Sequence, residues 1–112
     1  MAETFTSSAS IKPAATTPAT LYTAPASTKS MVLAITACNK GGAAAAVTIR
    51  NGKSGDTEGS LVDKELINNR NVDSNDALLY SEKVVLAAGD FIEVEASTAD
   101  VVFTATAILE IT

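Results

Sequence analysis

Apolar and polar residues alternate with a period of two along several short segments, and the clearest alternation lies between 86 and 112. Ile92, Val94 and Ala96 alternate with acidic or hydroxyl side chains, and 101–111 continues the pattern after a polar interruption. Successive side chains of a strand point to opposite faces, so this pattern predicts two strands with one buried face each. The buried row expected in the last strand comprises Val101, Phe103, Ala105, Ala107, Leu109 and Ile111.

Shorter apolar runs predict further strands upstream, and none has the 3.6-residue period of an amphipathic helix. The expected strands cover 21–23, 31–39, 44–50, 77–80 and 83–86. On the strand 31–39, the face expected to be buried carries Met31, Leu33, Ile35 and Ala37. Together with the terminal pair, these strands predict an all-β protein built as an antiparallel β-sandwich, of jelly-roll or immunoglobulin-like type.

The segment from 51 to 76 has weaker signals. Asn51-Gly52 is typical of a tight hairpin turn, because both central positions of that turn need positive φ. Residues 61–67 are compatible with an outer strand or with one helical turn. Residues 68–76, rich in Asn and Asp, are expected to form a loop.

Residues 1–18 are rich in Ser, Thr and Ala, and they contain Pro13 and Pro18, which cannot donate backbone hydrogen bonds. We expect an extended N-terminal arm over 1–18 and a single sandwich domain over 19–112. The arm is either a frayed terminus or a segment that orders along a neighbouring subunit, with Phe5 and Ile11 as anchors. A chain of 112 residues is long enough for one such core.

Composition removes most catalytic and metal-binding chemistry. The chain has no histidine, which is the commonest general base and metal ligand. Its single cysteine, Cys38, excludes an intrachain disulfide and a structural zinc site, and its apolar neighbours favour a buried, inert thiol. No glycine-rich phosphate loop is present. We therefore expect no enzymatic activity and no cofactor.

Charge also limits the partners. The formal net charge is −5 at pH 7, and no basic cluster follows an aromatic strip, so nucleic acid is not an expected partner. No apolar run has the length of a membrane-spanning helix, and Met1–Phe5 lacks the pattern of a secretion signal. We expect neither a membrane partner nor export by such a signal.

Two acidic groupings have a catalytic or metal-binding alternative. Asp73, Asn75 and Asp76 offer oxygen ligands, but they lack the glycine and bidentate glutamate of a calcium loop. Glu93 and Glu95 share one strand face and have the spacing of a carboxylate pair. Acids at alternate positions of a strand are more often a solvated surface that protects a sheet from edge pairing, so we expect that role.

Two groups of residues, taken in order, resemble a known family. The segment 21–25 (Leu-Tyr-Thr-Ala-Pro) precedes an apolar strand that ends in Cys38-Asn39, and 88–90 (Ala-Gly-Asp) precedes the terminal alternating strands. This combination resembles small all-β virion structural proteins of tailed bacteriophages. The resemblance covers 19–39 and 86–112, whereas 53–76 matches no pattern of that group.

The resemblance implies a module on the surface of a virion, assembled in the cytoplasm of the host bacterium. We expect a capsid decoration (cement) protein that binds the outside of the major capsid protein lattice, as a homotrimer by analogy with other cement proteins. The residues expected to contact partners lie in the arm and in the polar middle of the chain. They are Phe5, Ile11, Lys12, Asp63, Glu65, Arg70, Asp73 and Asp76.

Two alternatives stay open from the sequence. A tail, neck or fibre-attachment protein would have the same module with different partners. A carbohydrate- or receptor-binding module would need exposed aromatic side chains, for which Tyr80 and Phe91 are the candidates because Tyr22 and Phe103 are expected in the core.

Overall fold

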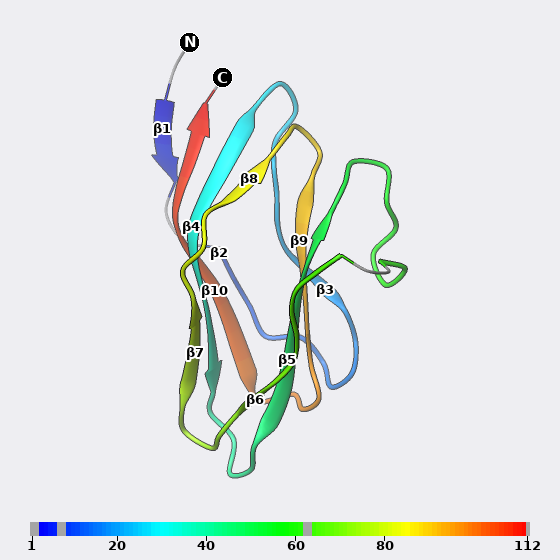
Figure 1. The fold of residues 1–112 in the computed structure, drawn as a ribbon, viewed down its shortest axis with the longest axis vertical. Coiled ribbons are helices and arrows are strands. Elements are labelled where there is room, and N and C mark those ends of the chain that lie inside the picture. The colour runs from blue at the N-terminus through cyan, green and yellow to red at the C-terminus, as the bar shows by residue number, and fades with distance from the viewer. Residues whose placement is uncertain (1–2, 7–8, 62–63, 112) are drawn as a thin grey trace.

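A computed structural model describes residues 3–6, 9–61 and 64–111, and every regular element in these ranges is a β-strand. The strands form two antiparallel sheets that face each other across one core (Figure 1). The predicted antiparallel β-sandwich is therefore confirmed. Within the same ranges, no helix is long and apolar enough to cross a membrane.

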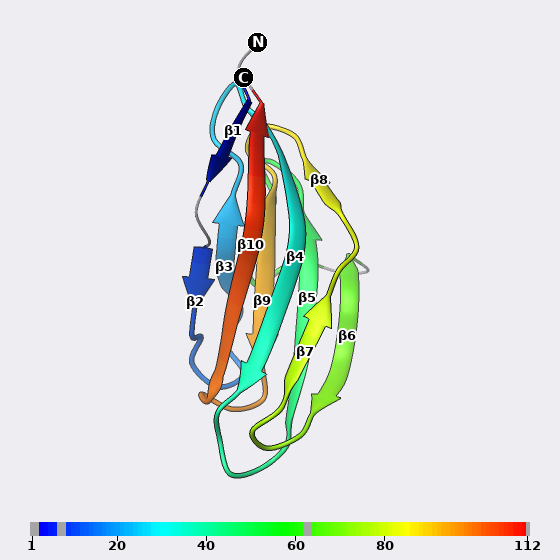
Figure 2. The same cartoon turned by 90° about the vertical axis from the view of Figure 1, so that its left-hand side faces the viewer.

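Each sheet has a continuous order of neighbouring strands (Figures 1 and 2). Sheet A runs in space from β1 (Glu3–Thr6) and β2 (Ala9–Ile11) through β10 (Val101–Ile111) and β4 (Lys29–Asn39) to β7 (Ala77–Tyr80) and β8 (Val84–Leu86). Sheet B has the order β3 (Ala19–Thr23), β9 (Phe91–Ala96), β5 (Ala45–Gly52), β6 (Glu65–Val72).

This order is that of a jelly roll. β1 and β2 both pair with β10, and β7 and β8 both pair with β4, so each couple acts as one interrupted strand. Counted in this way along the chain, sheet A contains the first, eighth, third and sixth strands. Sheet B contains the second, seventh, fourth and fifth. Two sheets joined by such crossovers distinguish a jelly roll from the immunoglobulin-like alternative.

The core lies between the sheets and is built mostly from Val, Ile and Ala side chains. Its largest fully buried member is Phe103 on β10, whose direct partner on β4 is Ala37, and Ile35 lies buried two residues along β4. Ile49 on β5 and Ile92 on β9 enter from sheet B. The inward positions predicted for β9 and for the first half of β10 are confirmed.

The long strands β4 and β10 reverse their buried faces in the middle, which the period-two pattern did not predict. Ile35 is buried, but the next inward residue of β4 is Val32, and Leu33 is 36% exposed. On β10, Ala107 is exposed and Ile108 is fully buried. Ala107 has φ 54°, in the left-handed region. This single left-handed residue reverses the face of β10 that follows it, so Leu109 points outward. The paired strand β4 changes its buried face at the same level, so Met31 points outward as well.

The segment 1–18 differs from the expected extended arm. Residues 3–6 pair with 108–111 of β10, and residues 9–11 pair with 103–105, all within the same chain. Pro13 and Pro18 lie in the connection to β3, where no ladder hydrogen bond is required. The segment therefore supplies the first strand of the jelly roll. The division of the chain at residue 18 stays a prediction.

The polar middle of the chain is partly strand. Of the two alternatives for 61–67, the strand is observed over 65–67, because β6 begins at Glu65, and residues 62–63 lie outside the described part of the structure. The strand continues through the Asn-rich residues 68–71, which were expected to be loop. β6 forms the outer edge of sheet B, where polar side chains stay in water, and Asn69 has φ 49° beside an irregularity in the β5–β6 pairing.

Candidate functional site

The residues that carry the family resemblance form structural joints in the jelly roll. The Ala24 backbone N–H donates to the Asp90 carbonyl at 2.9 Å, and the Gly89 N–H donates to the Ala24 carbonyl at 3.0 Å. The Asp90 carboxylate, which is almost buried, accepts from the N–H groups of Ala87 and Ser54. The first and second motif groups are therefore bonded to each other at one end of the molecule.

Asn39, the last residue of the first motif group, ties together the loops at the opposite end. Its side chain is fully buried, and Nδ2 donates to the carbonyls of Ala43 and Val72 at 2.8 and 3.0 Å. Its Oδ1 accepts from the Gly41 N–H at 3.0 Å. The β4–β5 loop and the start of the β6–β7 turn are thus fixed to the end of β4.

Tyr22 connects the two sheets. From β3 in sheet B, its hydroxyl donates to the Glu110 carboxylate at 2.6 Å and lies 2.9 Å from the Ser30 hydroxyl. Ser30 and Glu110 are direct partners on β4 and β10 of sheet A. Burial, followed by the hydrogen bond to Glu110, raises the pKa of Tyr22 to about 12. The tyrosine is therefore a neutral donor at all ordinary pH values.

Glu93 is part of a buried ionic network, and this corrects the prediction that Glu93 and Glu95 form a solvated surface. The Glu93 side chain has no exposed surface, and its Oε1 accepts from Arg50 at 2.9 Å. Arg50 also reaches Glu95 at 3.0 Å and Glu65 at 3.3 Å. Burial alone would lower the pKa of Arg50, but hydrogen bonds to the three carboxylates outweigh it, and the pKa is raised.

Residues 53–61 and 64 of the β5–β6 loop lie beside this network on the outer side of sheet B (Figure 1). The Gly59 N–H donates to Glu93 Oε2 at 2.7 Å, and Lys64 bonds to Asp56 within the loop. The hydrogen bond from Lys64 lowers the pKa of Asp56. Because both carboxylates of the predicted pair are bonded to one guanidinium, they are held as ion-pair partners rather than presented to a substrate.

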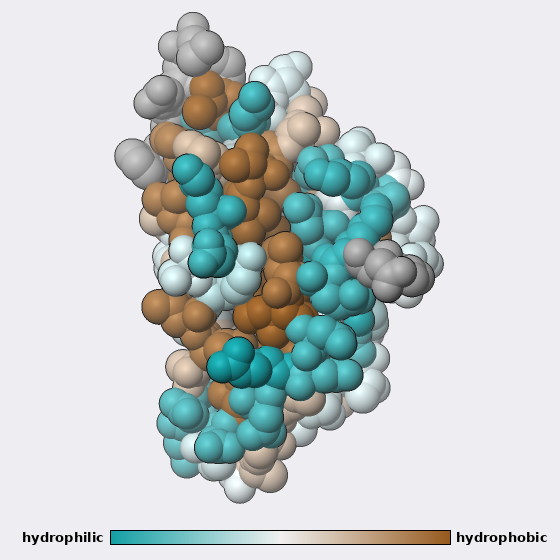
Figure 3. Space-filling model, viewed as in Figure 1, coloured by the Kyte–Doolittle hydropathy of each residue, from teal (hydrophilic) through white to brown (hydrophobic). Residues whose placement is uncertain are grey.

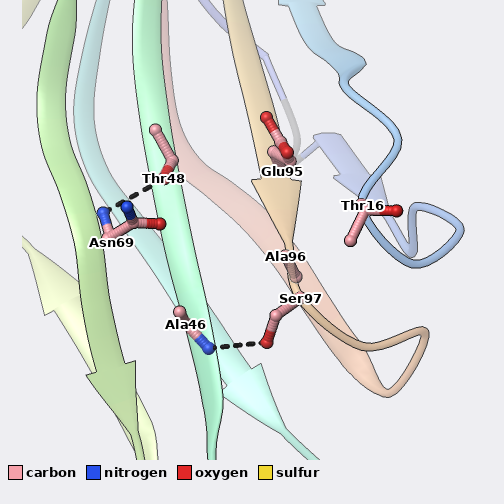
Figure 4. A pocket seen from close by; sticks show the side chains of 7 residues that line it. All are labelled: Thr16, Ala46, Thr48, Asn69, Glu95, Ala96 and Ser97. Carbon is pink, nitrogen blue, oxygen red and sulfur yellow. Dashed lines mark hydrogen bonds between the residues drawn. The ribbon is translucent and has the colours of Figure 1, made fainter.

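A small pocket lies beside this network, between β5, β9 and the β2–β3 connection (Figure 4). Its volume is about 130 Å³, enough for a few water molecules. Two of its lining groups are already bonded, since Ser97 Oγ accepts from the Ala46 N–H and Thr48 Oγ1 accepts from the Asn69 N–H. The lining residues are Thr16, Ala46, Thr48, Asn69, Glu95, Ala96 and Ser97.

The β6–β7 turn holds Asp73 and Asp76 in backbone and side-chain hydrogen bonds. The Asp76 N–H donates to the Asp73 carbonyl, Asn71 Nδ2 donates to Asp73 Oδ1, and Asp76 Oδ1 accepts from the Ala77 N–H. Among the residues whose side chains are described, no group of three or more acidic or sulfur ligands could hold a metal ion. The turn is therefore a capped connection between strands.

The six predicted contact residues whose side chains are described do not form one surface. Arg70, Asp73 and Asp76 lie together at the end of the molecule away from the termini, on β6 and the β6–β7 turn. Glu65 is bonded to Arg50 near the other end of β6. Ile11 packs against the core, and Lys12 is exposed just after it. Phe5 lies on β1, but its side chain is outside the described part of the structure, as is Asp63.

A surface that sequence patterns missed is the outer face of sheet A (Figure 2). Leu109 pairs with Met31, which pairs in turn with Val85, and these three side chains form a row across β10, β4 and β8. Val85 is 48% exposed, and Leu79, farther along the same face on β7, is 61% exposed. Cys38 is also exposed on this face, which corrects the expected buried thiol. Because β4 and β10 reverse their buried faces, strict alternation along the sequence places Met31 and Leu109 in the core and does not predict this row.

The charges of the two sheets differ. Over β2, β4, β7, β8 and β10, the charged residues are Lys29 at one strand end and Glu110, which bonds to Tyr22. Sheet B and its loop carry Arg50, Glu93 and Glu95 with further acids. Viewed at the edge of the sandwich, hydrophobic surface on the side of β7 and β8 is interrupted by hydrophilic residues, and hydrophilic surface covers the side of the β5–β6 loop (Figure 3). The five strands of sheet A whose side chains are described therefore carry few charges, whereas the outer face of sheet B is ionic.

The aromatic candidates for sugar binding lie in packed positions. Phe91 is 7% exposed, and its ring covers Gly52, where an added Cβ would lie 2.4 Å from the ring. Tyr80 is partly buried against the core. Burial and the nearby charge of Glu82 raise the pKa of Tyr80. The ring of Phe91 is therefore not free to stack on a sugar, and that of Tyr80 is partly covered.

No protein family description matches the sequence, and no curated protein matches it. Among solved structures, the chain is similar to a protein described as a pentameric capsid protein isolated from metagenomic phage sequences. The two are 20% identical, with a TM-score of 0.41. The match covers 92% of this chain and 60% of that protein, so this chain spans less than two thirds of its length.

Proposed function

We propose that this chain is a non-enzymatic structural protein of a bacteriophage virion, and specifically a capsid decoration protein. The observation that carries the proposal is the joint between Ala24, Gly89 and Asp90. The motif residues that resemble virion proteins are bonded to each other and lock a jelly roll, an architecture widely used in viral capsid domains. The resemblance and the fold thus rest on the same residues.

The distribution of charge supports a place on a shell surface. The ionic outer face of sheet B suits solvent, whereas a net charge of −5 is unsuited to contact with packaged nucleic acid. The bonded loops at the Asn39 end form a rigid polar end that includes Asp73 and Asp76. We propose this end as the contact with the major capsid protein on the outside of the lattice.

The first experiment is to count the copies of this chain per virion by quantitative mass spectrometry, relative to the major capsid protein. A decoration protein is expected in numbers comparable with the shell protein. A few to a few dozen copies would assign the chain to the tail, neck or fibre attachment instead. Absence from the particle would overturn the virion role.

Binding to shells emptied of DNA tests the contact region. Asp73→Lys and Asp76→Lys are expected to reduce shell binding because they reverse the charge of the proposed contact. The matched control is Glu82→Lys, an exposed acid in the β7–β8 connection. Equal binding by all three variants would show that the Asn39 end is not the contact. The homotrimer implied by the resemblance is the alternative to the pairing proposed below, and the mass of the purified chain distinguishes the two.

A further inference from the structure

We propose that the outer face of sheet A is the surface through which two copies of this chain associate, related by a two-fold axis. The inference does not depend on the proposed function, because it concerns the purified chain alone. It rests on three features of this face: exposed apolar side chains, the near absence of charge, and sufficient area.

The exposed and partly exposed apolar side chains of this face are neighbours rather than scattered. Val85, Met31 and Leu109 are direct neighbours across three strands, and directly opposed side chains in a sheet contact one another. Leu33 and Ile111 extend the row along β4 and β10 on either side. Contiguous apolar surface on a folded protein marks an interaction site, whereas single exposed apolar residues do not.

The distribution of charge favours a second copy of this chain as the partner that covers the outer face of sheet A. Each copy carries a net charge of −5, so two copies repel each other unless their acidic surfaces stay apart. Most of the acids lie on sheet B, on its loop and at strand ends. Over β2, β4, β7, β8 and β10 the outward charge of sheet A is Lys29 at its rim, and the exposed pair Glu82 and Lys83 lies in the β7–β8 connection at its edge. Pairing the two sheet A faces buries uncharged surface and leaves both acidic faces outward.

The geometry also fits a pair. The longest and shortest extents of the whole molecule, 46 and 19 Å, give the side that carries this face an outline of roughly 870 Å², so a pair would have to use nearly all of that side (Figure 2). A stable interface needs about 800 Å² from each partner. A two-fold axis places the same patch against itself, so an apolar row with few charges meets its own copy. A homotrimer would instead require this face to meet a different surface of the next copy.

The test is the mass of the purified full-length chain by sedimentation equilibrium over a range of concentrations. The wild type is expected at twice the monomer mass of 11.4 kDa. Leu33→Asp and Val85→Asp each place a charge in the interface and are expected to weaken association by at least about 100-fold. Asn68→Asp, which adds the same charge at an exposed position of β6, is expected to leave it unchanged.

A second readout protects the test against variants that fail to fold. Cys38 is exposed on the same face, so its alkylation by a maleimide in the wild type should slow as the protein concentration rises. Circular dichroism of each variant establishes that it is folded. A wild type that stays monomeric, an oligomer of any other size, or a dimer that both folded Asp variants leave intact would overturn the proposal.

Discussion

Arg50 Nη1 lies 2.9 Å from Glu93 Oε1, and the side chain of Glu93 is completely buried. The arginine comes from β5 and the glutamate from β9, which are neighbours in sheet B. The second carboxylate oxygen accepts from Gly59 in the β5–β6 loop. One cation therefore neutralises a buried anion and helps to hold a loop against the sheet.

Replacing Arg50 with Ala is expected to lower the free energy of unfolding by about 3–5 kcal/mol, because Glu93 would stay buried without its partner. Urea denaturation followed by circular dichroism measures the change. Glu95→Gln is the control, since Glu95 is 28% exposed and its contribution should be about 1 kcal/mol or less. The double variant Arg50→Leu/Glu93→Leu should recover much of the loss. Equal effects of Arg50→Ala and Glu95→Gln would contradict this account.

Asn39 is expected to be the most sensitive loop-anchoring residue. Asn39→Ala removes the partner of the Ala43 and Val72 carbonyls and of the Gly41 N–H, so we expect a loss of about 2–3 kcal/mol. Asn71→Ala, at an exposed position of β6, should change the unfolding free energy by less than about 0.5 kcal/mol. Thermal denaturation of both variants makes the comparison, and similar melting temperatures would rule out this anchoring role.

The fold class could be predicted because inward side chains alternate regularly along β9 and early β10. The polar residues between these two strands are of the kind found in turns. The burial of Glu93 was not predictable from local pattern, since its neutralising partner Arg50 is 43 residues away. Asn51-Gly52 has hairpin-turn chemistry, but in the structure Gly52 faces Phe91 in a strand pair, where no larger side chain fits. In both cases, the observed structure depends on contacts between residues that are distant in the sequence.

The surface of sheet A escaped prediction for a related reason. Ala107 gives no local signal for a left-handed conformation, which is more typical of Gly, Asn and Asp. β4 changes face opposite it, so the two strands stay paired on either side, at Ala34 and at Val32. If strict alternation is assumed along either strand, the residues on one side of the reversal are assigned to the wrong face of the sheet. The candidate interface could therefore be identified only from the pairing of the strands in the structure.

Ala107→Val is expected to destabilise the protein by about 1–2 kcal/mol even though position 107 is exposed. A β-branched residue at φ 54° is strongly disfavoured. Thr106→Val provides the control, because residue 106 has the ordinary extended conformation of β10. Denaturant titration gives both values. If Ala107→Val were as stable as Thr106→Val, the left-handed conformation and the face reversal would be incorrect.

Deletion of residues 1–17 is expected to destabilise the chain, in contrast to the removal of an independent arm. The deletion strips β1 and β2 from β10 and removes Ile11 from the core. We expect a loss of at least about 2 kcal/mol, or about 10 °C in melting temperature. Lys12→Ala, at an exposed position, is the control and should be neutral. An unchanged melting temperature of the truncated chain would support the original prediction that this segment is an arm separate from the domain.

Tyr22 makes stability depend on pH in the alkaline range. Its pKa is raised to about 12 in the folded protein, above its ordinary value near 10, so the unfolded chain loses the phenolic proton first. The stabilisation is fully present below pH 10 and is lost as the pH rises from about 10 to about 12. At higher pH the tyrosinate would also face Glu110, a like charge.

Tyr22→Phe is expected to remove this part of the pH dependence while lowering stability at neutral pH by about 1 kcal/mol through the lost hydrogen bonds. Lysines also titrate in the alkaline range, so the informative quantity is the difference between wild type and variant at each pH. Urea denaturation at pH 8, 9, 10 and 11 measures it, and the difference should shrink above pH 10. A difference that is constant across the series would exclude a raised Tyr22 pKa, and with it the hydroxyl bond from sheet B to Glu110.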